Sequence, residues 1–343
     1  MANILVVGPG ALGISTAVRL AKAGHNVIIA ARTEKSAALL QSQGLRLSLT
    51  SGETESVRLP VIIDPAQLDA KIDLLVLATK IGTALSSAAM WINVISKEGI
   101  FVPYQNGLLG DDFVKICGDK LVECAVYYGA TLIEPGHSKV TGPGHLHLGP
   151  WPRGTIEPSS RTERAAEILS SVMPTYTYDD MFSVKWNKLL YNAAGTSLGV
   201  VSGFNLAGMM SHAIVRNSFL DIVTESYAIA IAAGVKPMSL AGVNVGLIVR
   251  LPRFIAHLGL RFATRRNKEY KSSSQQSLER GEPTEVDFLN GRIVREALRL
   301  GLTAPWNRAI VETVHEVEAA PQSAGLNKIK LLREKVERYK SHQ

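Results

Sequence analysis

The chain opens with MANILVVGPGALGISTAVRLAKAGHNVIIAAR, residues 1–32, and this stretch decides the fold class. Apolar runs at residues 4–7 and 27–31 enclose the glycine-rich segment GPGALG at 8–13 and an alanine-rich helical stretch. This order predicts a strand, a tight turn, a helix and a second strand, which is the unit that binds dinucleotides.

The turn between the first strand and the helix supplies the candidate cofactor contacts. Gly8 permits the tight turn, Gly10 lets the backbone approach a pyrophosphate, and Gly13 lets the helix pack closely on the strand. The N–H groups of the helix N-terminus then face the anion. The expected cofactor-binding residues of the turn are Gly8, Pro9, Gly10, Ala11, Leu12 and Gly13. The alternative is a tight βα turn without a ligand.

Arg32 ends the second strand, where a site for NAD(H) would carry an acidic residue for the ribose 2′-hydroxyl. A guanidinium offers paired donors to phosphate oxygens. We therefore expect NADP(H) as the cofactor. The alternative is that Arg32 is a solvated residue that opens the next helix, with Glu34 as the only nearby acid.

Length and composition describe a globular protein of two domains. The chain has 343 residues, of which 46% are hydrophobic and 20% charged, and a length prior of about 150 residues per domain predicts two domains. The first residues lack a charged region followed by an apolar stretch, so we expect no signal peptide. The two cysteines, Cys117 and Cys124, match no metal or redox spacing. A cytoplasmic location is expected.

A formal net charge of +7 raises the question of nucleic acid. The basic residues are scattered, with local runs only at 261–271 and 328–340, and no aromatic residues interleave them. We therefore expect no nucleic-acid partner, and part of the excess charge would steer an anionic cofactor and a small anionic substrate.

Two apolar segments bear on membranes. The uncharged stretch 189–210 contains four glycines and several polar residues, so we expect a buried, kinked or broken helix and no integral membrane association. The segment GLIVRLPRFIAHLGLRFATRR at 246–266 is basic and amphipathic. Pro252 predicts a broken helix there, and a helical hairpin that covers the second domain is favoured over contact with a membrane surface.

The predicted fold is α/β, a Rossmann-type domain at residues 1–180 followed by an all-helical domain at 181–343, similar to 6-phosphogluconate dehydrogenase. Ligands of such sheets bind beyond the carboxyl ends of the parallel strands, so we expect the substrate in a cleft between the domains. The expected elements of the first domain are a hairpin at 45–49 and 57–63, buried strands at 73–78 and 99–104, antiparallel strands at 122–133 and 139–148, and a helix at 161–172.

Polar residues at two strand ends are further candidates. Lys80 follows the strand at 73–78, and Asn106 follows the strand at 99–104 and precedes Gly107. Strand ends also favour lysine and Asn-Gly for turn formation alone.

The helix that begins the second domain carries the strongest chemical candidates. Lys188 and Asn192 lie four residues apart and therefore share one face, which leads into an apolar, glycine-rich segment. A lysine in such surroundings indicates a residue with a functional role. Further on, Thr284 and Glu285 are expected to open a helix after Pro283, where an acidic residue is also explained by the helix dipole.

Taken together, these residues resemble the ketopantoate reductases, also called 2-dehydropantoate 2-reductases. The resemblance rests on the glycine turn, Arg32, Lys80, Gln105-Asn106-Gly107, Lys188 with Asn192, and PTEVDFLNG at 283–291, which occur in the family's order over nearly the whole chain.

The resemblance implies NADPH-dependent reduction of 2-dehydropantoate to pantoate, on the route to pantothenate and coenzyme A. It gives Lys188 the role of general acid and Glu285 that of orienting substrate and lysine. Asn106 would contact both the cofactor and the substrate. Asn192 would bind substrate near the nicotinamide, and Ser273 its carboxylate end. Arg32 and Lys80 would hold the 2′-phosphate side of NADPH. A homodimer is plausible for an enzyme of this size.

The chain departs from the family pattern in its substrate half. Thr196 stands where the family has a second substrate-facing asparagine, and Ser272-Ser273-Ser274 with Gln276-Ser277 replaces the usual serine motif. A hydroxyl replaces an amide hydrogen bond only in part. These departures lead to the hypothesis that the substrate is a different 2-oxo acid.

Other interpretations stay open. His145 and His147 share one face of a strand, but no third ligand is apparent, so no metal is expected. A related NADP-dependent dehydrogenase of the 6-phosphogluconate or 3-hydroxyacid type would lack the sequence at 283–287. A non-catalytic NADPH-binding sensor would not need Lys188 and Glu285.

Overall fold

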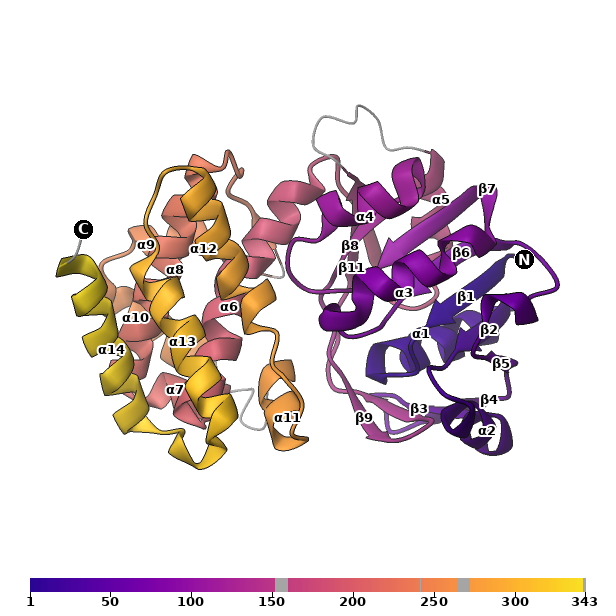
Figure 1. Ribbon diagram of the computed structural model, residues 1–343, viewed down its shortest axis with the longest axis horizontal. Coiled ribbons are helices and arrows are strands. Elements are labelled where there is room, and N and C mark those ends of the chain that lie inside the picture. Colours follow the sequence, from indigo (N-terminus) through magenta and orange to yellow (C-terminus); the bar gives the residue numbers. More distant parts are fainter. Residues whose placement is uncertain (152–159, 241, 264–271, 342–343) are drawn as a thin grey trace. The chain divides into compact units, whose positions relative to one another are not determined.

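In the computed structural model the chain divides into two compact units, Met1–Lys185 and Trp186–Gln343. The structure describes residues 1–151, 160–240, 242–263 and 272–341. The first unit is α/β with a parallel sheet and the second is helical (Figure 1), which confirms the predicted fold class.

A five-stranded parallel sheet forms the centre of the first unit, in the order β5-β2-β1-β6-β7. Its strands are β1 (Asn3–Val7), β2 (Asn26–Ala30), β5 (Val61–Ile62), β6 (Ile72–Leu77) and β7 (Ile95–Pro103). The continuous apolar runs of β1 and β6 are buried on both faces, as parallel strands require. Because all strands run in one direction, their carboxyl ends meet at a single edge.

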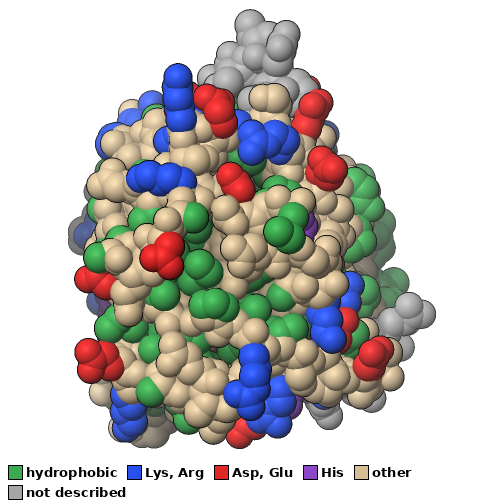
Figure 2. Space-filling model, turned by 90° about the vertical axis from the view of Figure 1, so that its right-hand side faces the viewer, with side chains coloured by type: hydrophobic (Ala, Val, Ile, Leu, Met, Phe, Trp, Pro, Cys, Tyr) green, Lys and Arg blue, Asp and Glu red, His purple; other side chains and the backbone are tan. Residues whose placement is uncertain are grey.

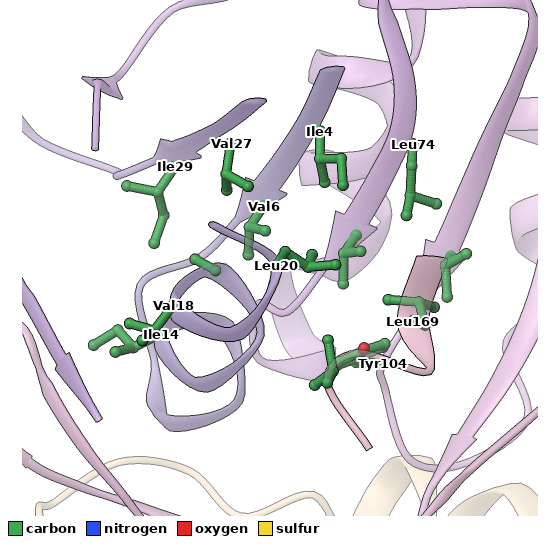
Figure 3. Packing of buried hydrophobic residues seen from close by; sticks show 14 of the residues in the cluster. Ile4, Val6, Ile14, Val18, Leu20, Val27, Ile29, Leu74, Tyr104 and Leu169 are labelled. Atoms are coloured by element: carbon green, nitrogen blue, oxygen red, sulfur yellow. The ribbon is translucent and has the colours of Figure 1, made fainter. Parts of the chain in front are cut away.

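Helix α1 (Ala11–Lys22) lies between this sheet and a second one. The second sheet has the order β4-β3-β10-β9, with β3 (Leu45–Ser48), β4 (Thr54–Val57), β9 (Ala130–Glu134) and β10 (His137–Val140). In Figure 3, Leu20 of α1 lies beside Val6 of β1, whereas Ile14 and Val18 lie on the other side of the helix. Arg19 of α1 pairs with Glu55 of β4 at 2.8 Å, so the helix is fixed on both sides.

The predicted long strand at 122–133 is wrong, because it is two strands in different sheets. A third sheet, β12-β11-β8, consists of β8 (Val122–Val126), β11 (Leu146–Pro150) and β12 (Thr175–Thr177). The predicted strand at 139–148 is likewise divided between β10 and β11. Glycines allow the crossing: a Cβ at Gly144 would lie 2.3 Å from the Tyr127 carbonyl oxygen, and one at Gly129 would lie 2.4 Å from Thr141 Oγ1.

Four more α-helices complete the described part of the first unit: α2 (Glu34–Gln43), α3 (Ala84–Trp91), α4 (Gly110–Cys117) and α5 (Ser160–Leu169). Helix α5 packs on β7, β8, β11 and β12 and ends before the predicted residue 172. On the face drawn in Figure 2, basic and acidic side chains are interspersed.

The second unit is built around α8, which contacts α7, α9, α12, α13 and α14. Its elements are α6 (Met181–Ser202), which begins in the first unit, α7 (Leu206–Ser211), α8 (Ala213–Ala232), a short pair β13 (Ser239–Leu240) and β14 (Val243–Asn244), α9 (Val245–Arg250), α10 (Arg253–Ala263), α11 (Ser273–Glu279), α12 (Asn290–Arg299), α13 (Pro305–Ala319) and α14 (Leu326–Ser341).

The uncharged stretch 189–210 is a broken helix, as predicted. Helix α6 continues through Gly195 and Gly199 and ends near Gly203, whose φ of +70° is incompatible with continuing the helix. Among the described residues no helix is long and apolar enough to cross a membrane.

The segment 246–266 is broken at Pro252 into α9 and α10, and its last three residues lie outside the described ones. As expected of a helical pair that covers the second unit, α9 packs on α8 and α10 packs on α7. His257 of α10 also bonds to Asn217 and Arg216 of α8. Phe254, Leu258 and Phe262 of α10 are exposed.

Candidate functional site

Four predicted cofactor contacts follow four neighbouring strands of the parallel sheet. Gly8 follows β1, Arg32 lies two residues after β2, Lys80 lies three residues after β6, and Asn106 lies three residues after β7. Since these strands are adjacent and parallel, the four positions lie at the same edge of the sheet. That edge is where open α/β sheets bind ligands.

The glycine turn has the geometry that a dinucleotide requires. Gly8 has a φ of +104°, and its N–H donates to the Ala30 carbonyl at 3.0 Å. Gly10 precedes the first residue of α1, and a Cβ there would meet no atom within 4 Å. A Cβ at Gly13 would lie 1.9 Å from the Gly8 carbonyl oxygen. The turn therefore packs tightly through Gly13 and is open at Gly10, as an approaching pyrophosphate needs.

Arg32 and Lys80 are both exposed at this edge. Arg32 lies between Ala31, whose N–H donates to the Ile62 carbonyl at 2.8 Å, and Thr33, whose side chain caps α2. Arg32 thus precedes the helix cap and does not belong to the helix. Lys80 precedes the 3₁₀ turn η2 (Ile81–Thr83), and its carbonyl accepts from Thr83 at 3.1 Å.

Gln105 was not predicted as a functional residue, yet it joins two of the strand ends. Its side chain is buried, and Nε2 donates to the carbonyls of Leu77 at 3.2 Å and Thr79 at 2.8 Å. The next residue, Asn106, is half-buried and precedes Gly107, which has a φ of +77°. The backbone before Lys80 is therefore tied to the backbone before Asn106.

A buried ion pair lies directly behind this edge and was also missed. Lys185 Nζ lies 2.7 Å from Glu123 Oε1, and the two side chains are 4% and 0% exposed. Burial raises the pKa of the Glu123 carboxyl, and the Lys185 ammonium opposes that change in part. The signal in the sequence is a lone acid in the apolar strand VECAV of β8.

In the second unit, α6 carries three residues that are predicted to face the substrate. Lys188 and Asn192 are half-buried, and Thr196 is buried one turn further on. Thr196 Oγ1 donates to the Asn192 carbonyl at 2.8 Å, so its hydroxyl proton is used within the helix. What stays accessible to another donor is the hydroxyl oxygen.

Glu285 does not open an α-helix as predicted. It precedes the 3₁₀ turn η5 (Val286–Phe288), and α12 begins only at Asn290. The reason lies in Asn290, which is fully buried and accepts from Ser197 Oγ of α6 at 2.6 Å while donating to Asn307 Oδ1 of α13 at 2.9 Å. These bonds fix the start of α12 and leave the half-buried Glu285 on the turn before it.

The serine stretch begins α11 and caps it. The Ser272 side chain accepts from the Gln275 N–H at 3.3 Å, while Gln275 Oε1 accepts from the Ser272 N–H at 3.0 Å. Gln275 Nε2 also donates to the carbonyls of Gly199 and Phe204, where α6 ends. The backbone of Ser273 is the first residue of α11, and its side chain lies outside the described ones.

His145 and His147 lie on one face, as predicted, with ring centroids 4.6 Å apart. Tyr127 and Tyr178 stack against them, so the pair belongs to an aromatic cluster. In the part of the chain that the structure describes, no group of three or more histidine, cysteine or acidic side chains is placed to hold a metal ion.

Comparison with known families accounts for most of the chain. A sequence model described as Ketopantoate reductase PanE/ApbA matches residues 4–153, and one described as Ketopantoate reductase PanE/ApbA C terminal matches residues 180–318. The chain belongs to the ketopantoate reductase family. Members of this family are enzymes, oxidoreductases that act on CH–OH groups.

Curated members of the ketopantoate reductase family match over nearly their whole length. The 2-dehydropantoate 2-reductase of Pyrococcus abyssi is 25% identical over 314 residues, covering 89% of this chain and 94% of that protein. The one of Archaeoglobus fulgidus is 26% identical over 324 residues, covering 92% and 98%.

Solved structures have the same fold. The PanE/ApbA family ketopantoate reductase from Ralstonia eutropha has a TM-score of 0.78 and 27% identity, over 93% of this chain and 99% of that chain. The ternary structure of D-mandelate dehydrogenase with NADH and anilino(oxo)acetate has a TM-score of 0.79 and 19% identity, over 93% and 99%. At that identity the second likeness concerns the fold alone.

Proposed function

We propose that the chain is an NADPH-dependent 2-dehydropantoate 2-reductase. The observation that carries the proposal is the shared edge of the parallel sheet, where the glycine turn, Arg32, Lys80 and Asn106 follow adjacent strands. Membership of the ketopantoate reductase family and the names of the relatives supply the reaction.

In this proposal residues 1–180 bind the cofactor and residues 181–343 bind the substrate. The glycine turn and the N-terminus of α1 hold the pyrophosphate, while the two exposed cations, Arg32 and Lys80, bind the 2′-phosphate. A guanidinium without an acidic neighbour on the strand end favours NADPH over NADH. When bound, the reduced nicotinamide supplies a hydride.

The chemistry on the substrate side is assigned to α6. A ketone carbon that gains a hydride leaves negative charge on its oxygen, which needs a proton. Lys188 donates that proton from Nζ, and Glu285 orients the lysine and the substrate. Asn106 contacts the nicotinamide as well as the substrate. Asn192 binds the substrate through its amide, and Ser273 binds the carboxylate. Thr196 offers its hydroxyl oxygen to the substrate as a hydrogen-bond acceptor.

A second candidate is a reductase of a different 2-oxo acid. Thr196 supports it, since its hydroxyl donates within α6 where the family has an asparagine amide. The capping of α11 by Ser272 supports it as well, because a serine side chain that caps a helix has less capacity left to bind the substrate.

The test is NADPH oxidation by the purified protein with 2-dehydropantoate and a panel of other 2-oxo acids. We expect Lys188→Ala to lower kcat by about 10²- to 10⁴-fold, as loss of a general acid does, with NADPH affinity retained. Lys335→Ala, in an ion pair with Glu316, is the matched control.

Three results are distinguishable. Lysine-dependent turnover of 2-dehydropantoate supports the proposal, and turnover of another 2-oxo acid alone supports the second candidate. NADPH binding without turnover of any acid would refute both and indicate a sensor.

A further inference from the structure

The Lys185 ammonium is buried in the first unit with three acceptors around it. Its Nζ lies 2.7 Å from Glu123 Oε1 and donates to the carbonyls of Gln105 at 2.9 Å and Cys124 at 3.1 Å. Two backbone hydrogen bonds and one close ion pair thus hold the ammonium in place.

Stability alone does not explain a buried pair of this kind. Removing two charges from water costs about as much as their attraction returns, and apolar side chains of similar volume often replace such pairs without loss of stability. The acceptors suggest another role. Gln105 is the residue before Asn106, and Glu123 and Cys124 belong to β8, which is part of a different sheet.

The hydrogen bonds continue from Gln105 to the neighbouring strand end. Its backbone carbonyl binds Lys185, while its side-chain amide donates to the carbonyls of Leu77 and Thr79. Thr79 is the residue before Lys80. A continuous set of bonds thus runs from the buried ammonium to the two segments that carry Lys80 and Asn106.

We propose that Lys185 and Glu123 are positioning residues of the dinucleotide site, which act through Gln105 to hold the backbone before Lys80 and Asn106 in its binding geometry. They do not touch the cofactor themselves. The inference rests on the proposed function, since that function makes Lys80 and Asn106 cofactor contacts.

The test separates position from stability with the double variant Lys185→Met/Glu123→Leu. Lys185→Met alone leaves the carboxyl buried without its counter-ion and is expected to be strongly destabilised. The double variant removes both charges at similar volume, so we expect its melting temperature to return close to that of the natural protein. Its Kd for NADPH should nevertheless be about 10- to 100-fold higher than that of the natural protein, as when residues that hold a binding residue in place are lost.

Backbone hydrogen exchange gives a second readout that needs no ligand. In the double variant, peptides covering residues 77–83 and 104–110 should exchange faster than in the natural protein. If the double variant binds NADPH as tightly as the natural protein and these peptides exchange unchanged, the pair is structural only and the inference is overturned.

Two further variants complete the design. Gln105→Met leaves the ion pair intact and removes the amide donor, so it should produce faster exchange at 77–83 even if the double variant does not fold; unchanged exchange there would also overturn the inference. Lys335→Met, in a partly buried pair with Glu316 in the second unit, should change neither readout. A natural protein that binds no NADPH would refute the proposed function, while hydrogen exchange would still decide the positioning role.

Discussion

Substitution of Gly13 by alanine should separate the packing of the glycine turn from its ligand binding. The new Cβ would lie 1.9 Å from the Gly8 carbonyl oxygen and 3.1 Å from its carbonyl carbon. Both atoms are backbone, so no side chain can rotate away. To reach ordinary contact, helix α1 and the turn must separate by about 1.5 Å, and the cost belongs at the upper end of overpacking, about 3 kcal/mol.

The magnitude is measurable by thermal unfolding. For a unit of this size, 1 kcal/mol shifts the melting temperature by about 2–4 °C, so Gly13→Ala should melt about 6–12 °C below the natural protein. Its NADPH affinity should fall as well, because the proposed function assigns the pyrophosphate to the displaced turn.

Gly10→Ala is the matched control. No atom lies within 4 Å of its new Cβ, and Gly10 has an ordinary φ of −80°. Its stability should change by about 1 kcal/mol or less, the cost of alanine at a helix N-cap. Its NADPH affinity should nevertheless drop sharply, because the methyl group occupies the path of the phosphates. Equal melting of Gly13→Ala and the natural protein, or full NADPH affinity in Gly10→Ala, would refute this reasoning.

Three further predictions follow from single residues. Arg32→Ser should lower NADPH affinity by about 10- to 100-fold and leave NADH affinity nearly unchanged, as titrations with both nucleotides would reveal; equal losses would mean that Arg32 does not contact the 2′-phosphate. Asn290→Leu should cost about 1–3 kcal/mol in denaturant unfolding, since it leaves the buried Ser197 hydroxyl without its acceptor; no measurable loss would contradict this role of Asn290. Burial raises the pKa of Cys117 to about 12, so its neutral thiol dominates at pH 8 and alkylation of the folded protein should be roughly a thousand-fold slower than that of a free thiol and still rise with pH at pH 10; labelling followed by mass spectrometry would contradict this if the rate levelled off near pH 9.

The sequence predicts those parts of the fold in which local pattern and burial agree. Strands β1 and β6 and the second half of β7, residues 100–103, are apolar runs, which is the pattern of parallel strands buried on both faces. The turn at residues 8–13 follows from the conformational demands on its glycines. Pro252 likewise marks a helix break that requires no knowledge of distant residues.

The wrong predictions of strand and helix bounds arise where contacts between distant residues determine the structure. The segment 122–133 is apolar enough overall to be predicted as one strand, and the change of sheet depends on close approaches of Gly144 to Tyr127 and of Gly129 to Thr141. The start of α12 depends on bonds from Asn290 to Ser197 and Asn307, which local propensity does not include.

The same limit applies to the candidate site. Strand-end positions are visible in the sequence, so Arg32, Lys80 and Asn106 could be predicted from the order of the strands. Gln105, Glu123 and Lys185 support them from behind, and their roles depend on contacts between residues that are 26 to 80 positions apart. Such contacts leave only a weak signal, a polar residue inside an otherwise apolar run.

The place of Lys185 in the chain has a consequence for dividing the protein. Lys185 is the fifth residue after the predicted domain end at 180, yet its ammonium lies in the interior of the first unit. A fragment cut at residue 180 would bury Glu123 without its counter-ion. The first turn of α6 is therefore part of the first unit, although the rest of that helix belongs to the second. If the two units are separated or exchanged as modules, the boundary has to lie after Lys185.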